Sequence, residues 1–302
     1  MTKLKSTDDA RQWFRDNDIR TVRLQTSNPD GQVHGKYMLV ENFLSSLPEG
    51  STIGDTLFSI DVSGHTPLSW AVGNWRGNDA DIAMEPDLST LTVDPYMEGL
   101  ASVVCYFRQT NGEDCPVCPR TLLRRQMDRL DAMGYETVVA VELEATAFCE
   151  SFDEAEEKGF RDLTPLDGPK TRQSPIFNRR RFTDYVSGVA GRLQALGIPC
   201  DGFFREMGAG QFEVNVKPTD AMKAADDAMR MRMACREVAD DLDRSLTFMP
   251  VCGDDMFVAG MHVNVSLRSK GKNTFYDERS PNKQSAVMRS FLGGVMQTLQ
   301  GA

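Results

Sequence analysis

The chain has 302 residues, enough for one large domain or two ordinary ones. Its 34 basic and 44 acidic residues give a formal net charge of −10, which argues against a protein whose main task is to bind nucleic-acid backbones. No segment has the roughly 20 apolar residues that span a bilayer, and the charged segment 1–20 lacks the apolar stretch of a secretory signal, so we expect a cytoplasmic protein that is not bound to a membrane.

The first part of the chain predicts a β-rich unit. Apolar residues among charges in segment 13–19 are typical of a short amphipathic helix. The turn sequence Asn28-Pro29-Asp30-Gly31 lies between two apolar stretches and predicts a β-hairpin over residues 22–39. Residues 40–95 favour short strands and loops, and residues 101–107 favour a strand.

The pattern changes after the loop at residues 111–119, so we place a domain boundary near residue 112. This gives an N-terminal β-rich domain over residues 1–111 and a second domain over residues 112–302. The second domain begins with a helix at Pro119 and continues with a strand over residues 137–141. Further helices are expected over residues 182–196, 221–242 and 280–299, and the charged segment 150–181, which lacks periodicity, is expected to be a surface excursion.

Two segments of the second domain carry paired carboxylates. Glu142 and Glu144 directly follow the apolar strand and are two residues apart, so they point to the same face. Glu206 and Glu213 flank a glycine-rich turn that permits unusual backbone angles and close approach of another group. Such carboxylates are the ligands that Mg²⁺ or Mn²⁺ prefers.

A third segment, residues 260–267, alternates as a strand and puts His262, Asn264 and Ser266 on one face. The chain has only three histidines, so a zinc site built from several histidines is not expected. A single glutamate or strand histidine is more often structural than functional. The residues alone therefore indicate an α+β protein with a candidate divalent-metal site.

Seven short segments strengthen this interpretation by their order. They are Asp30-Gly31 with Gly35-Lys36, Pro86-Asp87-Leu88-Ser89-Thr90-Leu91, Pro119-Arg120, Glu142-Leu143-Glu144 with Phe148, Glu206 to Glu213 with Ala225-Asp226, Thr247-Phe248-Met249-Pro250, and Gly260-Met261-His262. In this order they resemble the motifs of the glutamine synthetase family, and the resemblance covers nearly the whole chain.

The resemblance implies a fold and a chemistry. The fold would be a small β-grasp-like N-terminal domain and a catalytic domain of antiparallel strands and helices. The activity would be that of an ATP-dependent ligase, which phosphorylates the side-chain carboxylate of glutamate or a similar acid and then joins ammonia or an amine to it. Family members are large homo-oligomers, so the resemblance also implies an oligomer.

The resemblance also implies roles for individual residues. Glu144, Glu206 and Glu213 would hold a first Mg²⁺ or Mn²⁺ ion, with Glu144 and Glu213 serving the catalytic step. Glu142 and His262 would hold a second ion that faces the ATP phosphates. Asn264 and Ser266 would contact the nucleotide.

The chain also departs from the family pattern. Asn264 stands where the family usually has a second histidine, and Val251-Cys252 and Phe257-Val258-Ala259 replace other family residues near the substrates. The family's Asn-Arg-Ser-type loop and Arg-x-Glu-x-Arg strand do not occur before Ala302, so we expect a catalytic domain incomplete at its C-terminus. An alternative is therefore a catalytically inactive, truncated or split relative that keeps metal and nucleotide binding, acts as a regulatory partner, or assembles with a protein that supplies the C-terminal half.

Another alternative comes from Cys115-Pro116-Val117-Cys118, which could indicate a thiol or zinc site. No second cysteine pair accompanies it, so an incidental occurrence is favoured. The odd total of seven cysteines likewise does not indicate a disulfide framework.

Overall fold

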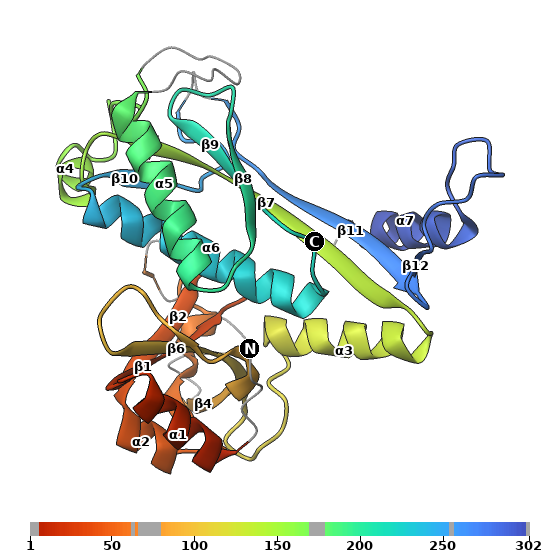
Figure 1. Cartoon of the computed structure of the whole chain (residues 1–302), viewed down its shortest axis with the longest axis horizontal. Coiled ribbons are helices and arrows are strands. Elements are labelled where there is room, and N and C mark those ends of the chain that lie inside the picture. Colours follow the sequence, from red (N-terminus) through yellow and green to blue (C-terminus); the bar gives the residue numbers. More distant parts are fainter. Residues whose placement is uncertain (1–5, 62–63, 66–79, 169–178, 254–256, 300–302) are drawn as a thin grey trace.

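The computed structural model describes residues 6–61, 64–65, 80–168, 179–253 and 257–299. These residues form two separate sheets (Figure 1). The strands of the first sheet all come from residues 21–108, and those of the second come from residues 136–273. The chain is therefore a mixed α+β protein, as the sequence predicts.

The first sheet has the strand order β2-β1-β6-β4-β3, and β5 also pairs with β6. The predicted hairpin is formed by β1 and β2, which are antiparallel, whereas β1 and β6 are parallel. Its strands are β1 (Thr21–Ser27), β2 (Val33–Leu39), β3 (Ser51–Gly54), β4 (Asp81–Pro86), β5 (Thr92–Val93) and β6 (Leu100–Arg108). The accompanying helices among the described residues are α1 (Thr7–Asp16), α2 (Val40–Ser45) and the 3₁₀ helices η1 (Asp55–Phe58) and η3 (Leu88–Thr90).

The second sheet has the order β12-β11-β7-β9-β8, and β10 pairs with β7. Its strands are β7 (Glu136–Phe148), β8 (Cys200–Arg205), β9 (Gln211–Val216), β10 (Ser245–Thr247), β11 (Met261–Ser269) and β12 (Lys272–Asn273). The helices of this part are α3 (Pro119–Ala132), α4 (Phe152–Glu157), α5 (Arg180–Ala195), α6 (Ala221–Asp241) and α7 (Ala286–Thr298).

Helices α5 and α6 pack on one face of the second sheet. Their apolar stripes meet the apolar side chains of β7 and β9 in a buried core that includes Val141, Leu143, Val214, Tyr185, Val189, Met231 and Cys235. The period of two in each strand then turns the intervening side chains to the opposite face. The helices thus cover one face of the second sheet and leave its other face available for a functional site.

One helix was not predicted, and the start of another was predicted wrongly. The segment 150–181 was expected to be a surface excursion, and its described part contains the short helix α4. This helix begins with a capping box, in which the Ser151 side chain accepts from the backbone N–H of Glu154 and the Glu154 side chain accepts from that of Ser151. The last helix was expected from Ser280-Pro281, but it begins at Ala286, because the Ser285 hydroxyl caps it by accepting from the backbone N–H of Met288.

Helix α6 also contacts the first sheet, which lies on its other side (Figure 1). Glu237 of α6 forms a buried ion pair with Arg23 of β1, and Arg230 of α6 donates to the backbone carbonyl of Thr90. Asp226 of α6 pairs with Arg120 at the start of α3. One helix therefore packs on the second sheet and holds the first sheet in place.

Candidate metal centre

The carboxylates of β7 lie on the face of the second sheet that α5 and α6 leave open. Val141 and Leu143 point into the core and are 4% and 3% exposed. Glu142 and Glu144 alternate with them, so both point to the opposite face, as the sequence predicts. This alternation places two negative charges on the central strand of the sheet.

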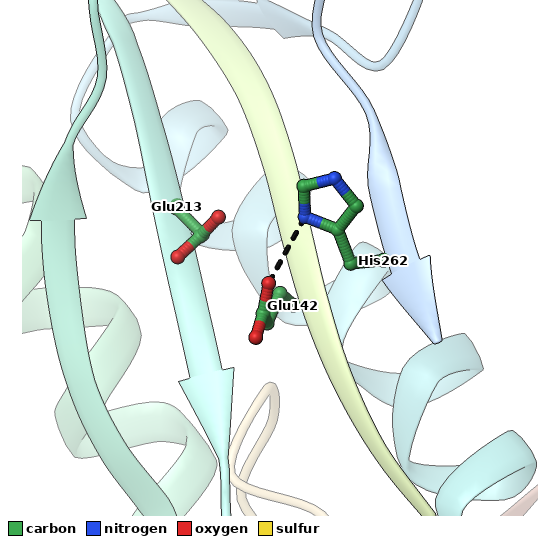
Figure 2. Close-up of side chains that lie close together, drawn as sticks. All are labelled: Glu142, Glu213 and His262. Carbon is green, nitrogen blue, oxygen red and sulfur yellow. Dashed lines mark hydrogen bonds and ion pairs between the residues drawn. The ribbon is translucent and has the colours of Figure 1, made fainter. Parts of the chain in front are cut away.

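The register of the sheet adds residues from both neighbouring strands. Glu213 of β9 lies directly opposite Glu144, and His262 of β11 lies directly opposite Glu142. Side chains at directly opposed positions of antiparallel strands are close neighbours on the same face. One ligand atom each of Glu142, Glu213 and His262 lies within 4.8 Å of the others, and the three side chains point toward one another (Figure 2).

The cluster is strongly acidic. The pKa of Glu213 is raised, because burial disfavours its charged form and the charges of Glu142, Glu206 and Glu144 repel it, although the Asn215 amide donates to it and acts in the opposite direction. Glu206, directly after β8, therefore belongs to the same electrostatic cluster, but it is not part of the triplet within 4.8 Å. A bound divalent cation would relieve this repulsion.

Both oxygens of Glu142 have partners from β11. His262 Nδ1 lies 3.0 Å from Glu142 Oε2, and the Asn264 amide donates to Glu142 Oε1 at 2.8 Å. This contact and a distance of 4.0 Å to Glu144 Oε1 show that the Nδ1 side of the His262 ring faces the carboxylates. Ser266 lies further along the same face of β11, opposite Val138.

Glu144 is held by a residue that the sequence analysis did not single out. The buried amide of Gln211 donates to Glu144 Oε2 at 2.8 Å, and the backbone N–H of Gly260 donates to the same oxygen at 3.0 Å. Gln211 lies inside the segment Glu206 to Glu213 that carries the resemblance, and this position was the signal that could have identified it.

The glycine-rich turn between Glu206 and Gln211 is held in place by contacts of Gly210 with β7 and with Asp167. Gly210 has a φ of +74°, and a Cβ atom there would lie 2.4 Å from the carbonyl oxygen of Ala147. Its N–H donates to Asp167 Oδ1 at 2.8 Å, and Asp167 also pairs with the buried guanidinium of Arg205. The glycine is therefore required by both its backbone angle and the close approach of β7.

The cysteine pair lies elsewhere. Cys115 and Cys118 are 3% and 1% exposed in the core of the first sheet, and Cys118 Sγ accepts from the backbone N–H groups of Phe107 and Thr121. Burial raises the pKa of the Cys115 thiol, so this thiol is less reactive than an exposed one. All seven cysteines lie among the described residues, and none of them is joined in a disulfide.

Every helix among the described residues is too short or too polar to cross a membrane.

Comparisons with known proteins agree on one family. The family model of the glutamine synthetase catalytic domain matches residues 116–302. A glutamate–isopropylamine ligase from a Pseudomonas species is 31% identical over 95% of this chain and 63% of its own length. A γ-glutamylethanolamide synthetase from Streptomyces coelicolor is 28% identical over 94% of this chain and 61% of its own length.

Solved structures show the same fold. A crystal structure described as a novel glutamine synthase homologue has a TM-score of 0.79 and 21% identity, and the match covers 99% of this chain and 64% of that chain. This chain therefore spans somewhat less than two thirds of the length of these relatives.

Proposed function

The chain belongs to the glutamine synthetase family, and from this premise we propose that it carries the metal-binding face of an ATP-dependent ligase. The reaction would join ammonia or an amine to the side-chain carboxylate of glutamate. The observation that carries the proposal is the convergence of Glu142, Glu213 and His262 from three adjacent strands, with Glu144 beside them.

The donor set fits Mg²⁺ or Mn²⁺. Carboxylate oxygens with a single imidazole are hard ligands, and zinc would prefer more histidine and cysteine. We assign Glu144, Glu206 and Glu213 to a first ion and Glu142 and His262 to a second. When bound, such ions would neutralise negative charge on the phosphates of ATP in the phosphoryl-transfer step.

The remaining residues of this face would orient the ligands and the nucleotide. The Asn264 amide donates to Glu142 and would therefore orient that carboxylate toward the ion. Ser266, on the same face of β11, remains assigned to the nucleotide together with Asn264. Glu144 and Glu213, which lie opposite each other, remain the proposed catalytic pair.

The proposed chemistry follows from the substrate. A carboxylate is a poor electrophile, because its negative charge repels a nucleophile and oxide is a poor leaving group. Transfer of the γ-phosphoryl group of ATP to the carboxylate would give an acyl phosphate and ADP. An amine nitrogen would then attack the acyl carbon, phosphate would leave with the C–O bonding electrons, and the nitrogen would lose a proton to give the amide.

The relatives support an amine as the second substrate. Two of them are named for isopropylamine and for an ethanolamide product. Both names describe glutamate joined to a small amine, so we propose a small primary amine or ammonia for this chain.

The test is calorimetric titration of the purified chain with ATP and Mg²⁺ or Mn²⁺. The parent chain is expected to bind nucleotide only with the metal, and a Glu144→Ala/Glu213→Ala variant is expected to lose this binding. A Glu156→Ala/Glu157→Ala variant is the matched control, because it removes two exposed carboxylates from α4. Nucleotide binding that is equal in all three proteins would refute the proposed site.

A second candidate concerns association. Helix α7 has no buried residue, and Leu292, Val295 and Met296 are 42%, 44% and 68% exposed. Exposed apolar helix surfaces of this kind mark contact sites. We therefore also propose that α7 is a contact surface in a homo-oligomer or for a partner protein. Analytical ultracentrifugation of the chain alone tests the oligomer, and a monomer that lacks ligase activity would favour the partner or a regulatory role.

A further inference from the structure

The side-chain amide of Gln211 is fully engaged at the edge of the metal centre. Gln211 is 2% exposed, and its Oε1 accepts from the backbone N–H of Gly208 at 3.0 Å. Its Nε2 donates both to Glu144 Oε2 at 2.8 Å and to the carbonyl oxygen of Val258 at 3.0 Å. The amide therefore joins the glycine-rich turn, the strand β7 and the segment before β11.

The absence of a side chain at Gly208 leaves room for this amide in the turn. A Cβ atom at Gly208 would lie 2.4 Å from Gln211 Oε1, so a larger residue there would displace the amide. Because the amide is held at both ends, its Nε2 has a fixed direction. Preorganised partners of this kind set the orientation of a ligand before the metal arrives.

The two oxygens of Glu144 are consequently not equivalent. Oε2 accepts two hydrogen bonds, from Gln211 Nε2 and from the backbone N–H of Gly260. Oε1 faces the metal ligands and lies 4.0 Å from His262 Nδ1. A carboxylate fixed in this way presents a single oxygen to a cation.

We infer that Gln211 is a positioning residue that holds Glu144 as a one-oxygen ligand and so makes the centre selective for Mg²⁺ over Ca²⁺. The inference rests on the proposed metal centre. Mg²⁺ requires a near-ideal octahedron of single oxygen atoms at about 2.0–2.1 Å, whereas Ca²⁺ accepts six to eight oxygens and readily takes both oxygens of one carboxylate. Occupying Oε2 with two N–H donors therefore disfavours the larger ion.

The experiment is calorimetric titration of the purified full chain with MgCl₂ and, separately, with CaCl₂. In Gln211→Met all three hydrogen bonds of the amide are lost while the length of the side chain is kept. The expected result is a loss of Mg²⁺ affinity of about tenfold or more, with a smaller loss or a gain for Ca²⁺, so that the ratio of the two affinities falls. Gln211→Asn keeps an amide, but its side chain is one methylene too short to contact Gly208 and Glu144 together. The ratio of Mg²⁺ affinity to Ca²⁺ affinity is therefore expected to fall in this variant as well.

Gln25→Met is the matched control, because Gln25 is also a buried glutamine, 3% exposed, but lies on β1 of the first sheet. It is expected to keep the parent ratio, and thermal unfolding in chelator checks that each variant is folded. An unchanged ratio in both Gln211 variants, with binding lost in Glu144→Ala/Glu213→Ala, would overturn the inference and leave the proposed centre intact. A parent chain that binds neither ion would overturn the proposed centre and the inference with it.

Discussion

Glu237 of α6 lies at the centre of a buried ion-pair network between the two sheets. Its Oε1 is 2.6 Å from Arg23 Nη1, and its Oε2 is 3.0 Å from Arg192 Nη1. Arg23 also pairs with Asp94 at 2.5 Å, and these two carboxylates raise the pKa of Arg23 although burial acts to lower it. The side chains of Arg23 and Glu237 are only 10% and 8% exposed.

The substitution Glu237→Gln removes one charge and leaves the side-chain volume unchanged. Breaking a buried ion pair by removing one partner costs about 3–5 kcal/mol, because the other charge stays buried without compensation. Arg23 keeps Asp94 and Arg192 keeps Asp241. Burial also raises the pKa of Glu237 although Arg23 and Arg192 act to lower it, which reduces the cost of removing its charge. Two buried arginines would nevertheless lose their shared carboxylate, so we expect the lower end, a loss of about 3 kcal/mol in the free energy of unfolding. With a urea dependence of about 3 kcal/mol per molar, the midpoint would fall by about 1 M.

The assay is urea unfolding followed by circular dichroism, with Glu98→Gln as the control. Glu98 pairs with Arg20 at 3.4 Å, and these side chains are 95% and 70% exposed. An exposed ion pair contributes at most about 1 kcal/mol, so the control is expected to lie close to the parent. Equal midpoints for the two variants would refute the argument that the buried network holds the sheets together.

Three further predictions concern single residues. The pKa of Glu150 is about 2 rather than 4.5, because hydrogen bonds from Lys158 and Thr164 outweigh its burial. Its stabilisation is therefore present above the unfolded pKa of 4.5 and is lost as pH falls through the folded pKa of about 2, so Glu150→Gln should cost about 2 kcal/mol in urea unfolding at neutral pH and progressively less as the pH falls below 4.5. Glu213→Gln should raise the melting temperature in chelator while weakening Mg²⁺ binding in calorimetry, because it removes a repelled charge that is also a ligand. Gly210→Ala should lower the free energy of unfolding in urea by about 1–3 kcal/mol and weaken Mg²⁺ binding. The φ of +74° and the close approach of the Ala147 carbonyl oxygen disfavour any side chain at this position.

The sequence predicts local features of the site well. Alternation along β7 is a local property, so the shared face of Glu142 and Glu144 follows from the spacing alone. The pairing of Glu142 with His262 joins residues 120 positions apart, and strand register between distant segments depends on the packing of the whole sheet. The resemblance to a family, rather than the spacing, brought these residues together in the sequence analysis.

Other features of the fold were missed for different reasons. The helix α4 has too few apolar positions for a periodic pattern, and only its capping box indicates where it begins. At α7, Ser280 and Ser285 both resemble helix caps, and the choice between them depends on the contact of the Ser285 hydroxyl with the carbonyl oxygen of Thr274. The role of Gln211 depends on atoms of three segments, which no pattern in one segment reveals.

Helix α6 links the stability of the molecule to the geometry of the proposed site. Met231 and Cys235 of this helix lie in the core against the second sheet. Their close neighbours in the sequence, Arg230 and Glu237, instead contact the part of the chain that contains the first sheet. Since successive helical residues are about 100° apart, one stripe of a helix can bury apolar side chains while an adjacent stripe buries charged ones. The apolar stripe fixes which face of β7 is covered, and therefore which face carries Glu142 and the other carboxylates. The charged stripe fixes the position of the first sheet, so a change at Glu237 should loosen the association of the two sheets while leaving the carboxylate face itself formed.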